Sequence, residues 1–489
     1  MQLRHMFLRP LLRPLRAKLS IGVFLLIGLI VVGPVAQACD VAVISRTASA
    51  TGRPIIWKNR DDSNSYFMGI RSYPARDPKI GAHICLQEVV YLLNIPICGG
   101  GANESGFAVL NASVYSDTNV EETLNVDIAV MKKALETCDR VVCFEKLLEH
   151  WNDAPSSTAV ISSNFVAMDA FEGVILIEAH SGIGTKPEVF RVDAGDPGSG
   201  GIANHTNFNR YVDNPGIERK ERGATLLNDL EKNGKLDPAN IMKTVAKDVC
   251  GDTPALVPER FPTNKCISRA QTTAAVVIEG VAPGMDPRLT TMWVNLGEPS
   301  AGVFVPTFPA AQSVPTKTAS NNSLGFSAFN LAIVDKQFSL YDNAGSINSI
   351  LPSPMMDTTI NLPKLRALQA EVQPIEDDIV ARTTAFMNGP AANPGLLSPT
   401  ALANFSQAAT EESYARYVGA GWNSGRIELK VFARWALQTI RQRSAIAENI
   451  RRGVQVNQRY LKSQLPLEGA ALSEALRKAT SSSTTMPTP

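Results

Sequence analysis

The chain has 489 residues, of which 44% are hydrophobic and 19% are charged, and its formal net charge at pH 7 is +1. This is the composition of an ordinary globular protein, with enough length for one large domain or two to three smaller ones. It has neither the basic excess of a nucleic-acid-binding protein nor the acidic block of a solvated tail, so we exclude nucleic acid as a partner.

The first 38 residues have the pattern of a secretory signal peptide. Basic residues precede an apolar run over 21–35, and Ala36-Gln37-Ala38 then forms a small-x-small cleavage site. The run is short of the about 20 residues that a membrane-spanning helix needs, although an uncleaved N-terminal anchor remains the alternative. Cleavage predicts an exported protein, periplasmic or secreted, that begins at Cys39 and no longer contacts a membrane.

From Cys39 onward, β-branched alternation and turn residues predict a series of strands. The expected strands are 40–44, 55–57, 86–93, 106–112, 165–169, 173–177, 189–192, 201–205, 272–278, 290–296 and 303–306. The segment 55–57 ends in the polar residues Lys58-Asn59-Arg60-Asp61, and the glycine-rich segment 99–106 is expected to be a turn.

Amphipathic patterns predict helices between and after these strands. They are expected over 121–151, 214–248, 362–387, 399–418 and 425–451. Strands, helices, a hairpin, helices and further strands in this order predict an α+β fold of two antiparallel sheets flanked by helices. We expect a catalytic domain over 39–355, a helical C-terminal region over 356–479 and a disordered tail over 480–489.

The seven cysteines divide into three local pairs and one odd residue. The pairs are Cys85 with Cys98, Cys138 with Cys143, and Cys250 with Cys266. Six cysteines allow 15 pairings, and local pairing is the simplest in an oxidising compartment. Cys39 is then the lone thiol, which is a sign of reactivity. No Cys or His spacing resembles a zinc site, and we expect no metal or other cofactor.

A cysteine at the cleavage site has two interpretations. One is a lipoprotein whose Cys39 is acylated, but the long polar Gln37 fits a lipoprotein signal poorly. The other, which we favour, is a catalytic nucleophile. An N-terminal cysteine supplies a thiolate to attack and an α-amine, with a pKa of about 7.7–8.0, to act as the base, so no separate histidine is required.

Several segments together resemble the choloylglycine hydrolase and penicillin acyltransferase group of N-terminal nucleophile (Ntn) hydrolases, over roughly residues 39–306. Lys58-Asn59-Arg60-Asp61 is similar to the family's basic-Asn-x-Asp segment. The resemblance implies that Asp61 holds the α-amine of Cys39 and that Lys58 takes the place of an arginine common in the family. Lysine lacks the planar fork of arginine, so this departure leaves the basic role open.

Three further segments extend the resemblance. The stretch that ends in Asn111 is similar to the family's Gly-Asn-Glu-x-Gly segment, and Ala203-Asn204-His205 to its Thr-Asn-His or Thr-Asn-Ser element. These imply that Asn111, through its backbone N–H, and Asn204, through its side-chain amide, donate to the oxyanion. Arg269, in Ser268-Arg269, would stabilise the carboxylate or thiolate. The late segment 291–299 resembles a Met-Trp strand of acyltransferase-like members and has no catalytic role.

The family resemblance implies a four-layer αββα Ntn-hydrolase sandwich with a C-terminal helical extension, and an enzyme that hydrolyses a linear amide bond of a small molecule through an acyl-Cys39 intermediate. Taken singly, Asp61 could be a solvated turn residue, and Asn111 and Asn204 turn or capping residues; their order along the chain favours the site. Acyl transfer to an amine, a membrane-tethered lipoprotein with a binding role, and a family member that binds without turnover stay open. The sequence also leaves open the substrate and a homo-oligomer.

Overall fold

The computed structural model describes residues 39–61, 68–90, 95–114, 124–125, 127–150, 159–181, 188–209, 216–250, 260–263, 265–320, 327–341, 359–389, 393 and 396–421. The predicted signal peptide, the predicted helix over 425–451 and the predicted tail lie outside these ranges. Within them, no helix combines the length and the apolar character needed to cross a membrane.

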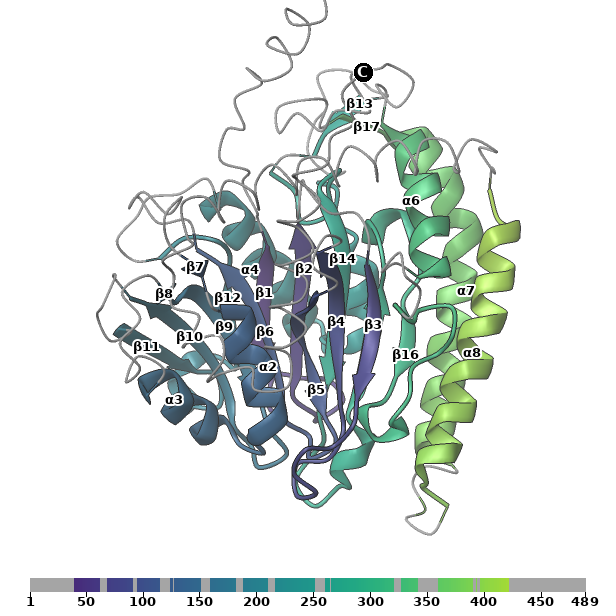
Figure 1. Cartoon of the computed structure of the whole chain (residues 1–489). Coiled ribbons are helices and arrows are strands. Elements are labelled where there is room, and N and C mark those ends of the chain that lie inside the picture. The colour runs from purple at the N-terminus through teal and green to yellow at the C-terminus, as the bar shows by residue number, and fades with distance from the viewer. Residues whose placement is uncertain are drawn as a thin grey trace, which may run out of the picture. The chain divides into compact units, whose positions relative to one another are not determined.

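The first sheet has six antiparallel strands in the order β12-β1-β2-β14-β15-β16 (Figure 1). The strands are β1 (Asp40–Ile44), β2 (Ile55–Asp61), β12 (Ile202–His205), β14 (Thr272–Glu279), β15 (Thr291–Asn295) and β16 (Val305–Thr307). The strand that begins one residue after Cys39 is therefore central, paired with β12 on one side and β2 on the other.

The second sheet has seven antiparallel strands in the order β11-β10-β9-β6-β5-β4-β3. The strands are β3 (Met68–Tyr73), β4 (His83–Val90), β5 (Ile95–Asn103), β6 (Ala108–Ser113), β9 (Ser162–Met168), β10 (Val174–His180) and β11 (Glu188–Asp193). Two small sheets pair β7 (Leu124–Asn125) with β8 (Ala159–Val160), and β13 (Arg260–Pro262) with β17 (Thr359–Asn361).

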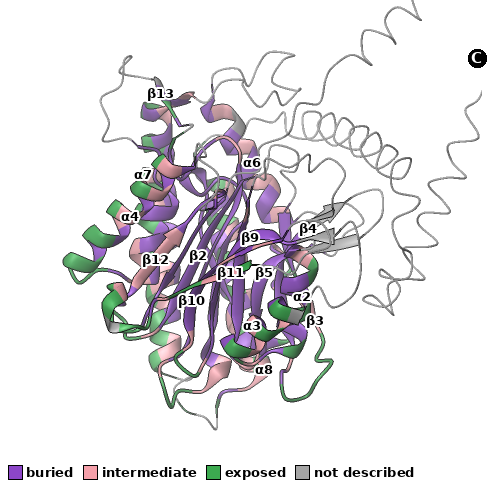
Figure 2. Cartoon of the chain, turned by 90° about the vertical axis from the view of Figure 1, so that its left-hand side faces the viewer, coloured by how far each residue is buried: buried purple, intermediate pink, exposed green. Residues whose placement is uncertain are grey.

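Alternation along the strands of the second sheet assigns its two faces. Leu110 and Val166 belong to the core shared with the first sheet, whereas their neighbours Val109 and Phe165 belong to a second core with helices α2 (Asp127–Thr137) and α3 (Val141–His150). The strands of both sheets are largely buried, whereas α3 and α4 (Ile217–Lys232) each have an exposed face (Figure 2). The second sheet is thus covered by the first sheet on one face and by helices on the other.

The outer face of the first sheet is covered by the segment that follows β12. Helix α4 packs on β1 and β12, and the short helices α5 (Pro238–Asn240) and η4 (Ile241–Ala246) pack on β14. Leu227 of α4 and Met242 of η4 are fully buried there. The layers are therefore helix, sheet, sheet and helix.

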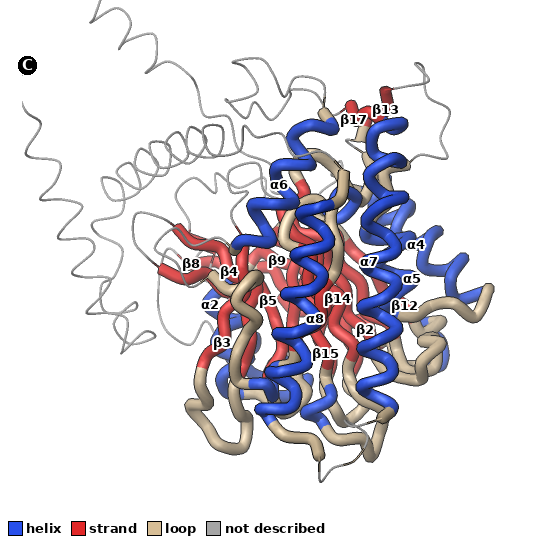
Figure 3. Tube along the Cα trace, turned by 90° about the vertical axis from the view of Figure 1, so that its right-hand side faces the viewer, coloured by secondary structure: helices blue, strands red, loops and turns tan. Residues whose placement is uncertain are grey.

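The C-terminal helices cover the β16 edge. Helices α7 (Leu362–Asn388) and α8 (Pro399–Gly419) lie side by side and contact β16, and α6 (Ala328–Leu340) packs against both (Figure 3). A buried ion pair joins Lys247, which follows η4, to Glu376 of α7 at 2.9 Å, and Glu376 also accepts a hydrogen bond from the Phe304 backbone N–H. The described helices of the C-terminal region therefore share the core of the sheets.

The predicted α+β fold, with two antiparallel sheets in a helix-sheet-sheet-helix order and a C-terminal helical extension, is confirmed. The prediction of a turn over 99–106 is wrong in its first half, because Gly99–Asn103 belong to β5. A Cβ on Gly101 would lie 1.8 Å from the Ile84 carbonyl oxygen, so glycine here permits a close approach of strands. Strand β3 and helix α6 were not predicted.

The structure contains the three local disulfides that the sequence favoured. Cys85–Cys98 joins β4 to β5, Cys138–Cys143 joins the end of α2 to α3, and Cys250–Cys266 precedes the segment that leads into β14. Cys39 is the one free cysteine, and it is buried. All seven cysteines lie in the described ranges, so the odd thiol is Cys39, as predicted.

Candidate active site

Cys39 immediately precedes β1 at one end of the first sheet. Val41, two residues later, pairs with Lys58 of β2 and with His205 of β12. The Lys58 side chain reaches Gly99 and Asn111 of the second sheet, and the His205 ring lies 2.9 Å from the Asn164 amide of β9. This face of the first sheet therefore looks toward the second sheet. Strand alternation puts the Cys39 side chain on the same face, between the sheets.

Among the cations that act on the Cys39 thiol, Lys58 has the largest effect on its pKa. Its Nζ donates to the Asn111 Oδ1 at 2.6 Å and to the Gly99 carbonyl oxygen at 3.3 Å, and the side chain is buried. Burial lowers the pKa of Lys58, while the charge of Cys39 opposes that shift. The structure thus places Lys58 between Asn111, to which it donates, and Cys39, whose thiol it influences by its charge.

The Cys39 thiol responds to burial and to these neighbours in opposite directions. Burial raises the pKa of the thiol, the Lys58 charge lowers it, and the Asp61 charge raises it. A hydrogen bond from the Asp61 backbone also lowers it, but burial has the largest effect and the net pKa lies above the ordinary value. Since the thiolate is the nucleophilic form, Lys58 is the largest influence that favours reactivity.

Asp61, the last residue of β2, forms a buried pair with Arg269. The Arg269 Nε donates to the Asp61 Oδ2 at 2.8 Å, the Arg269 Nη2 donates to the same oxygen, and the Thr272 Oγ1 donates to the Asp61 Oδ1 at 2.6 Å. The predicted site residues Asp61 and Arg269 are therefore in contact. Asp61 contacts the thiol through its backbone, and its side chain is occupied by Arg269 and Thr272.

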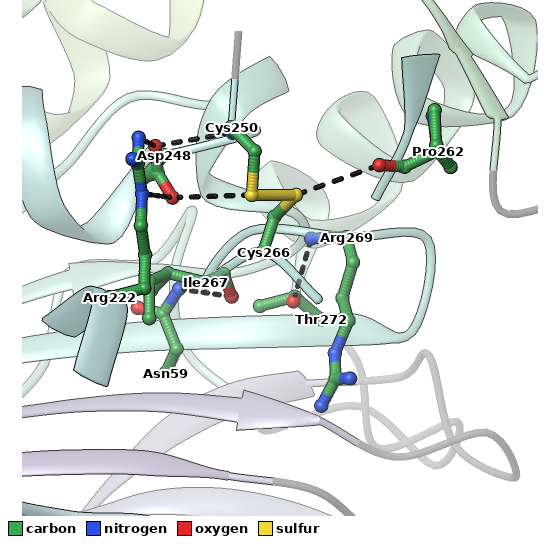
Figure 4. The surroundings of a disulfide bond; sticks show 9 residues. All are labelled: Asn59, Arg222, Asp248, Cys250, Pro262, Cys266, Ile267, Arg269 and Thr272. Carbon is green, nitrogen blue, oxygen red and sulfur yellow. Dashed lines mark hydrogen bonds and ion pairs between the residues drawn. A yellow bond between two sulfur atoms is a disulfide. The ribbon is translucent and has the colours of Figure 1, made fainter. Parts of the chain in front are cut away.

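The segment that carries Arg269 is fixed by its surroundings (Figure 4). It follows the Cys250–Cys266 disulfide, and the Arg269 backbone N–H donates to the Thr272 Oγ1 at 3.1 Å. Asn59 of β2 donates to the Ile267 carbonyl oxygen at 3.2 Å. These bonds tie the segment to β2, which also carries Lys58 and Asp61.

The Asn111 side chain has no amide hydrogen left for a substrate. Its Nδ2 donates to the Asp127 Oδ2 at 2.8 Å and to the Ser163 Oγ at 3.1 Å, while its Oδ1 accepts from Lys58. This agrees with the expectation that any oxyanion contact of Asn111 is made by its backbone N–H, and that role stays a prediction.

The structure does not bring Asn204 to Cys39. Asn204 pairs with Ala42, so it lies on the opposite face of the sheet from Val41 and Cys39. Its Nδ2 donates to the Lys220 carbonyl oxygen of α4 at 2.7 Å. The side chain predicted to stabilise the oxyanion is instead attached to the covering helix.

Asn207, three residues later, takes the place expected for Asn204. Its Oδ1 accepts a hydrogen bond from the Cys39 backbone nitrogen, and its Nδ2 donates to the Ser113 carbonyl oxygen at 2.6 Å. The sequence offered a signal for it, because Thr206-Asn207 matches the Thr-Asn element more closely than Ala203-Asn204 does.

Two charged residues beside Cys39, Asp40 and Arg219, were also missed. Arg219 of α4 donates from Nη1 to the Asp40 Oδ1 at 2.7 Å and to the Cys39 carbonyl oxygen at 3.3 Å, and from Nη2 to the Asn207 Oδ1 at 3.2 Å. Burial raises the pKa of Asp40 to about 6, although the Arg219 charge opposes this. Arg219 therefore holds Asn207 and the beginning of β1 together.

The described residues contain no group of three His, Cys, Asp or Glu side chains suited to a metal ion. The polar groups around Cys39 are amides, hydroxyls, the lysine Lys58, the arginines Arg60, Arg219 and Arg269, and the carboxylates of Asp40 and Asp61. This set fits acyl transfer by a thiol, in which charge on sulfur and on a carbonyl oxygen has to be stabilised.

No family model matches the sequence, and no curated protein matches it. Among solved structures, the chain is similar to an N-acylethanolamine-hydrolyzing acid amidase ortholog from Caenorhabditis elegans, with 14% identity and a TM-score of 0.33, over 52% of this chain and 99% of that chain. It is also similar to two variants of a conjugated bile acid hydrolase from Clostridium perfringens, with 13% identity and TM-scores of 0.33 and 0.32, over 53% of this chain and 89% of each of theirs.

Proposed function

We propose that the protein is an exported cysteine amidase of the choloylglycine hydrolase type, which hydrolyses a linear carbon–nitrogen amide bond of a small molecule. The observation that carries this proposal is the environment of Cys39. The one free cysteine of the chain lies between the sheets beside Lys58. Its backbone nitrogen donates a hydrogen bond to Asn207, and its sulfur accepts one from the Asp61 backbone.

In the proposed reaction, signal cleavage after Ala38 turns the Cys39 peptide nitrogen into a free α-amine. The amine accepts the thiol proton as the sulfur attacks the amide carbonyl carbon, and a tetrahedral oxyanion forms. The protonated amine then gives its proton to the leaving nitrogen, the carbon–nitrogen bond breaks and an acyl-thioester remains. Water attacks the thioester with the amine again acting as base, and the carboxylic acid leaves with Cys39 restored.

Each surrounding group has a role in this sequence. Asn207 has a second Nδ2 hydrogen beyond the one given to Ser113, and it supplies a side-chain donor for the oxyanion. The Asn111 backbone N–H is the second donor. Lys58 stabilises the thiolate, while Arg219 fixes the Asn207 oxygen next to the amine. Donors of this kind contribute about 3–4 kcal/mol each to transition-state stabilisation.

Asp61 and Arg269 support the same end of the site. Because Arg269 and Thr272 occupy the Asp61 carboxylate, the Asp61 backbone is held in position to contact the thiol. Asn207 is the acceptor for the Cys39 nitrogen in the uncleaved chain. We assign Asp61 a further contact with the free amine only once cleavage has given that nitrogen its additional hydrogens.

The first test is the intact mass of the exported protein. We expect a chain that starts at unmodified Cys39 and has lost six hydrogens to three disulfides. An acylated Cys39 would instead identify a lipoprotein, and a retained signal would leave no free amine to act as base; either result rejects the mechanism.

The second test is turnover of a panel of N-acyl amino acids and other linear amides by the wild type and by Cys39→Ala. We expect release of free carboxylic acid by the wild type and no turnover by the variant. Equal turnover by both would refute the proposal. Addition of an amine acceptor distinguishes acyl transfer from hydrolysis, since a transferase would form a new amide in place of the acid.

A further inference from the structure

Asp127, the first residue of α2, is a buried carboxylate that the proposed reaction does not use. It is 2% exposed, and Asn111 of the second sheet lies between it and Lys58 of the first. Its Oδ2 accepts hydrogen bonds from the Asn111 Nδ2 at 2.8 Å, the Ser113 Oγ at 2.7 Å and the Ser163 Oγ at 3.0 Å. A carboxylate so placed needs such donors, since a buried charge without them is strongly unfavourable.

The two charged neighbours of Asn111 fix the orientation of its amide. An ionised carboxylate can only accept hydrogen bonds, so it requires the NH₂ group of Asn111 on the Asp127 side. An ammonium can only donate, so it requires the amide oxygen on the Lys58 side. The observed contacts satisfy both conditions, with the Asn111 Oδ1 2.6 Å from the Lys58 Nζ. If the amide rotated by half a turn, it would oppose both neighbours.

We propose that Asp127 is a positioning residue, which acts through Asn111 to hold the Lys58 ammonium beside the Cys39 thiol. The inference rests on the proposed function, because it assigns Asp127 a part in activating that nucleophile. The Asp127 carboxylate also favours the charged form of Lys58, and the Lys58 charge in turn lowers the pKa of the Cys39 thiol. The position of the Lys58 ammonium and its charge therefore both favour the thiolate form of Cys39.

The test measures the pH dependence of Cys39 alkylation by iodoacetamide in the exported protein without substrate. Six of the seven cysteines are in disulfides, so under non-reducing conditions the modification reports Cys39. For Asp127→Asn we expect the midpoint of the alkylation profile to rise by about one pH unit. On a good substrate, kcat at neutral pH should fall about tenfold with little change in KM, because one unit alters the thiolate fraction tenfold.

Further variants separate positioning from a structural role. Asp127→Glu keeps an acceptor-only carboxylate and should retain a profile close to wild type. Asn111→Ala cuts the same link from the other side and should raise the midpoint as Asp127→Asn does, which keeps the test available if Asp127→Asn does not fold. With Lys58→Met in the background, Asp127→Asn should have no additional effect on the midpoint, because its route to the thiol is already gone.

Asp169→Asn is the matched control. Asp169 is also a buried carboxylate with three donors, which are the backbone N–H groups of Phe171 and Gly173 in the turn between β9 and β10 and of Val141 at the start of α3. The Asp169→Asn variant should be less stable than wild type, but the pH midpoint of Cys39 alkylation should not change.

Three outcomes would overturn the inference: an unchanged midpoint in folded Asp127→Asn, an equal shift in Asp169→Asn, or additive shifts with Lys58→Met. Alkylation requires no amide turnover. A shifted midpoint in a protein that hydrolyses no amide would therefore reject the proposed function and leave the positioning intact, whereas an active enzyme with an unchanged midpoint would do the reverse.

Discussion

The two halves of the β1–β2 hairpin are both buried, but one half is apolar and the other is charged. In the half near the connecting turn, Ile44 pairs with Ile55 and Val43 with Ile56, and all four side chains are fully buried. In the half near Cys39, β2 ends in Lys58-Asn59-Arg60-Asp61, and none of these is more than 8% exposed. The same pair of strands thus changes from an apolar core to a buried charged cluster within a few residues.

This difference separates the part of the hairpin that stabilises the fold from the part that the proposed reaction would use. The apolar half gains free energy by leaving water. The charged half gains little, because desolvation offsets the attraction within a buried ion pair. It is tolerated because partners are provided: Asn111 for Lys58, Thr273 for Arg60 and Arg269 for Asp61. Substitutions in the charged half should therefore affect reactivity, and those in the apolar half stability alone.

The largest effect is expected where a buried charge loses its partner. Arg269→Met removes the buried ion pair of Asp61, and Thr272 is then the side chain among the described residues that still donates to this carboxylate. We expect the free energy of unfolding to fall by about 3–5 kcal/mol, as measured by urea denaturation at pH 7. The Cys39 alkylation profile should shift as well, because the Asp61 backbone contacts the thiol.

The control for Arg269→Met is the double variant Asp61→Asn with Arg269→Met. Removal of both charges should restore a large part of the lost stability, because no unpaired charge remains. If the double variant is less stable than Arg269→Met, the loss of unfolding free energy comes from the missing ion pair and not from the unpaired Asp61 carboxylate.

The next largest effect distinguishes Asn207, which follows β12, from Asn204, which lies within it. Asn207→Ala removes the proposed oxyanion donor and the acceptor at the Cys39 nitrogen, and we expect kcat to fall about 10²–10³-fold. Asn204→Ala removes only the bond to Lys220 on the outer face, so it should cost about 1 kcal/mol of stability and leave kcat within about threefold of wild type. Steady-state kinetics with both variants decides the assignment; the reverse ranking would restore Asn204 to the site.

The same pair shows how far the sequence could predict this site. It proposed Cys39, Lys58, Asp61, Asn111 and Arg269, and the structure places these five residues near one another. It predicted Asn204 and missed Asn207, because face assignment depends on strand register, and a one-residue change of register reverses every side chain. Only the pairing of Ala42 with Asn204 reveals the outward face.

Asp127 and Arg219 could not be found from local patterns. Each is a charged residue at the beginning of an amphipathic helix, where such residues ordinarily face water, and each is buried because of partners distant in the chain. The fold was more predictable, because β1 and the β9–β10 hairpin contain continuous apolar runs rich in β-branched residues, bounded by turn residues. The glycine-rich part of β5 lacks that signal, and its strand conformation depends on close contact with Ile84.

A buried carboxyl without a cation sharpens the contrast with Asp61. Glu298 accepts hydrogen bonds from Tyr341, Ser300 and Ser268, and burial raises its pKa to about 7. A folded-state pKa raised above its ordinary value of 4.5 means that stability falls as pH rises from about 4.5 to about 7 and then levels off. Relative to wild type, Glu298→Gln should therefore gain about 2 kcal/mol of stability between pH 5 and pH 8.

Urea denaturation across this pH range measures the Glu298 effect, and Tyr341→Phe provides its control. The Tyr341 hydroxyl lowers the pKa of Glu298, so its removal should move the loss of stability to higher pH. If wild type and Glu298→Gln have parallel stability curves between pH 5 and pH 8, Glu298 does not titrate in this range.

The smallest effect tests the apolar half of the hairpin. Ile56→Val removes one methylene from a fully buried side chain that pairs with Val43 and Ile278, and the expected loss is about 1 kcal/mol of unfolding free energy. Ile56 is two residues before Lys58 on the same strand face, so a general loosening of β2 would also disturb Lys58. We expect the midpoint of Cys39 alkylation to stay at its wild-type value in urea-free buffer. A shifted midpoint would show that the packing of the apolar half controls the charged half, and would remove the separation between the two parts of the hairpin.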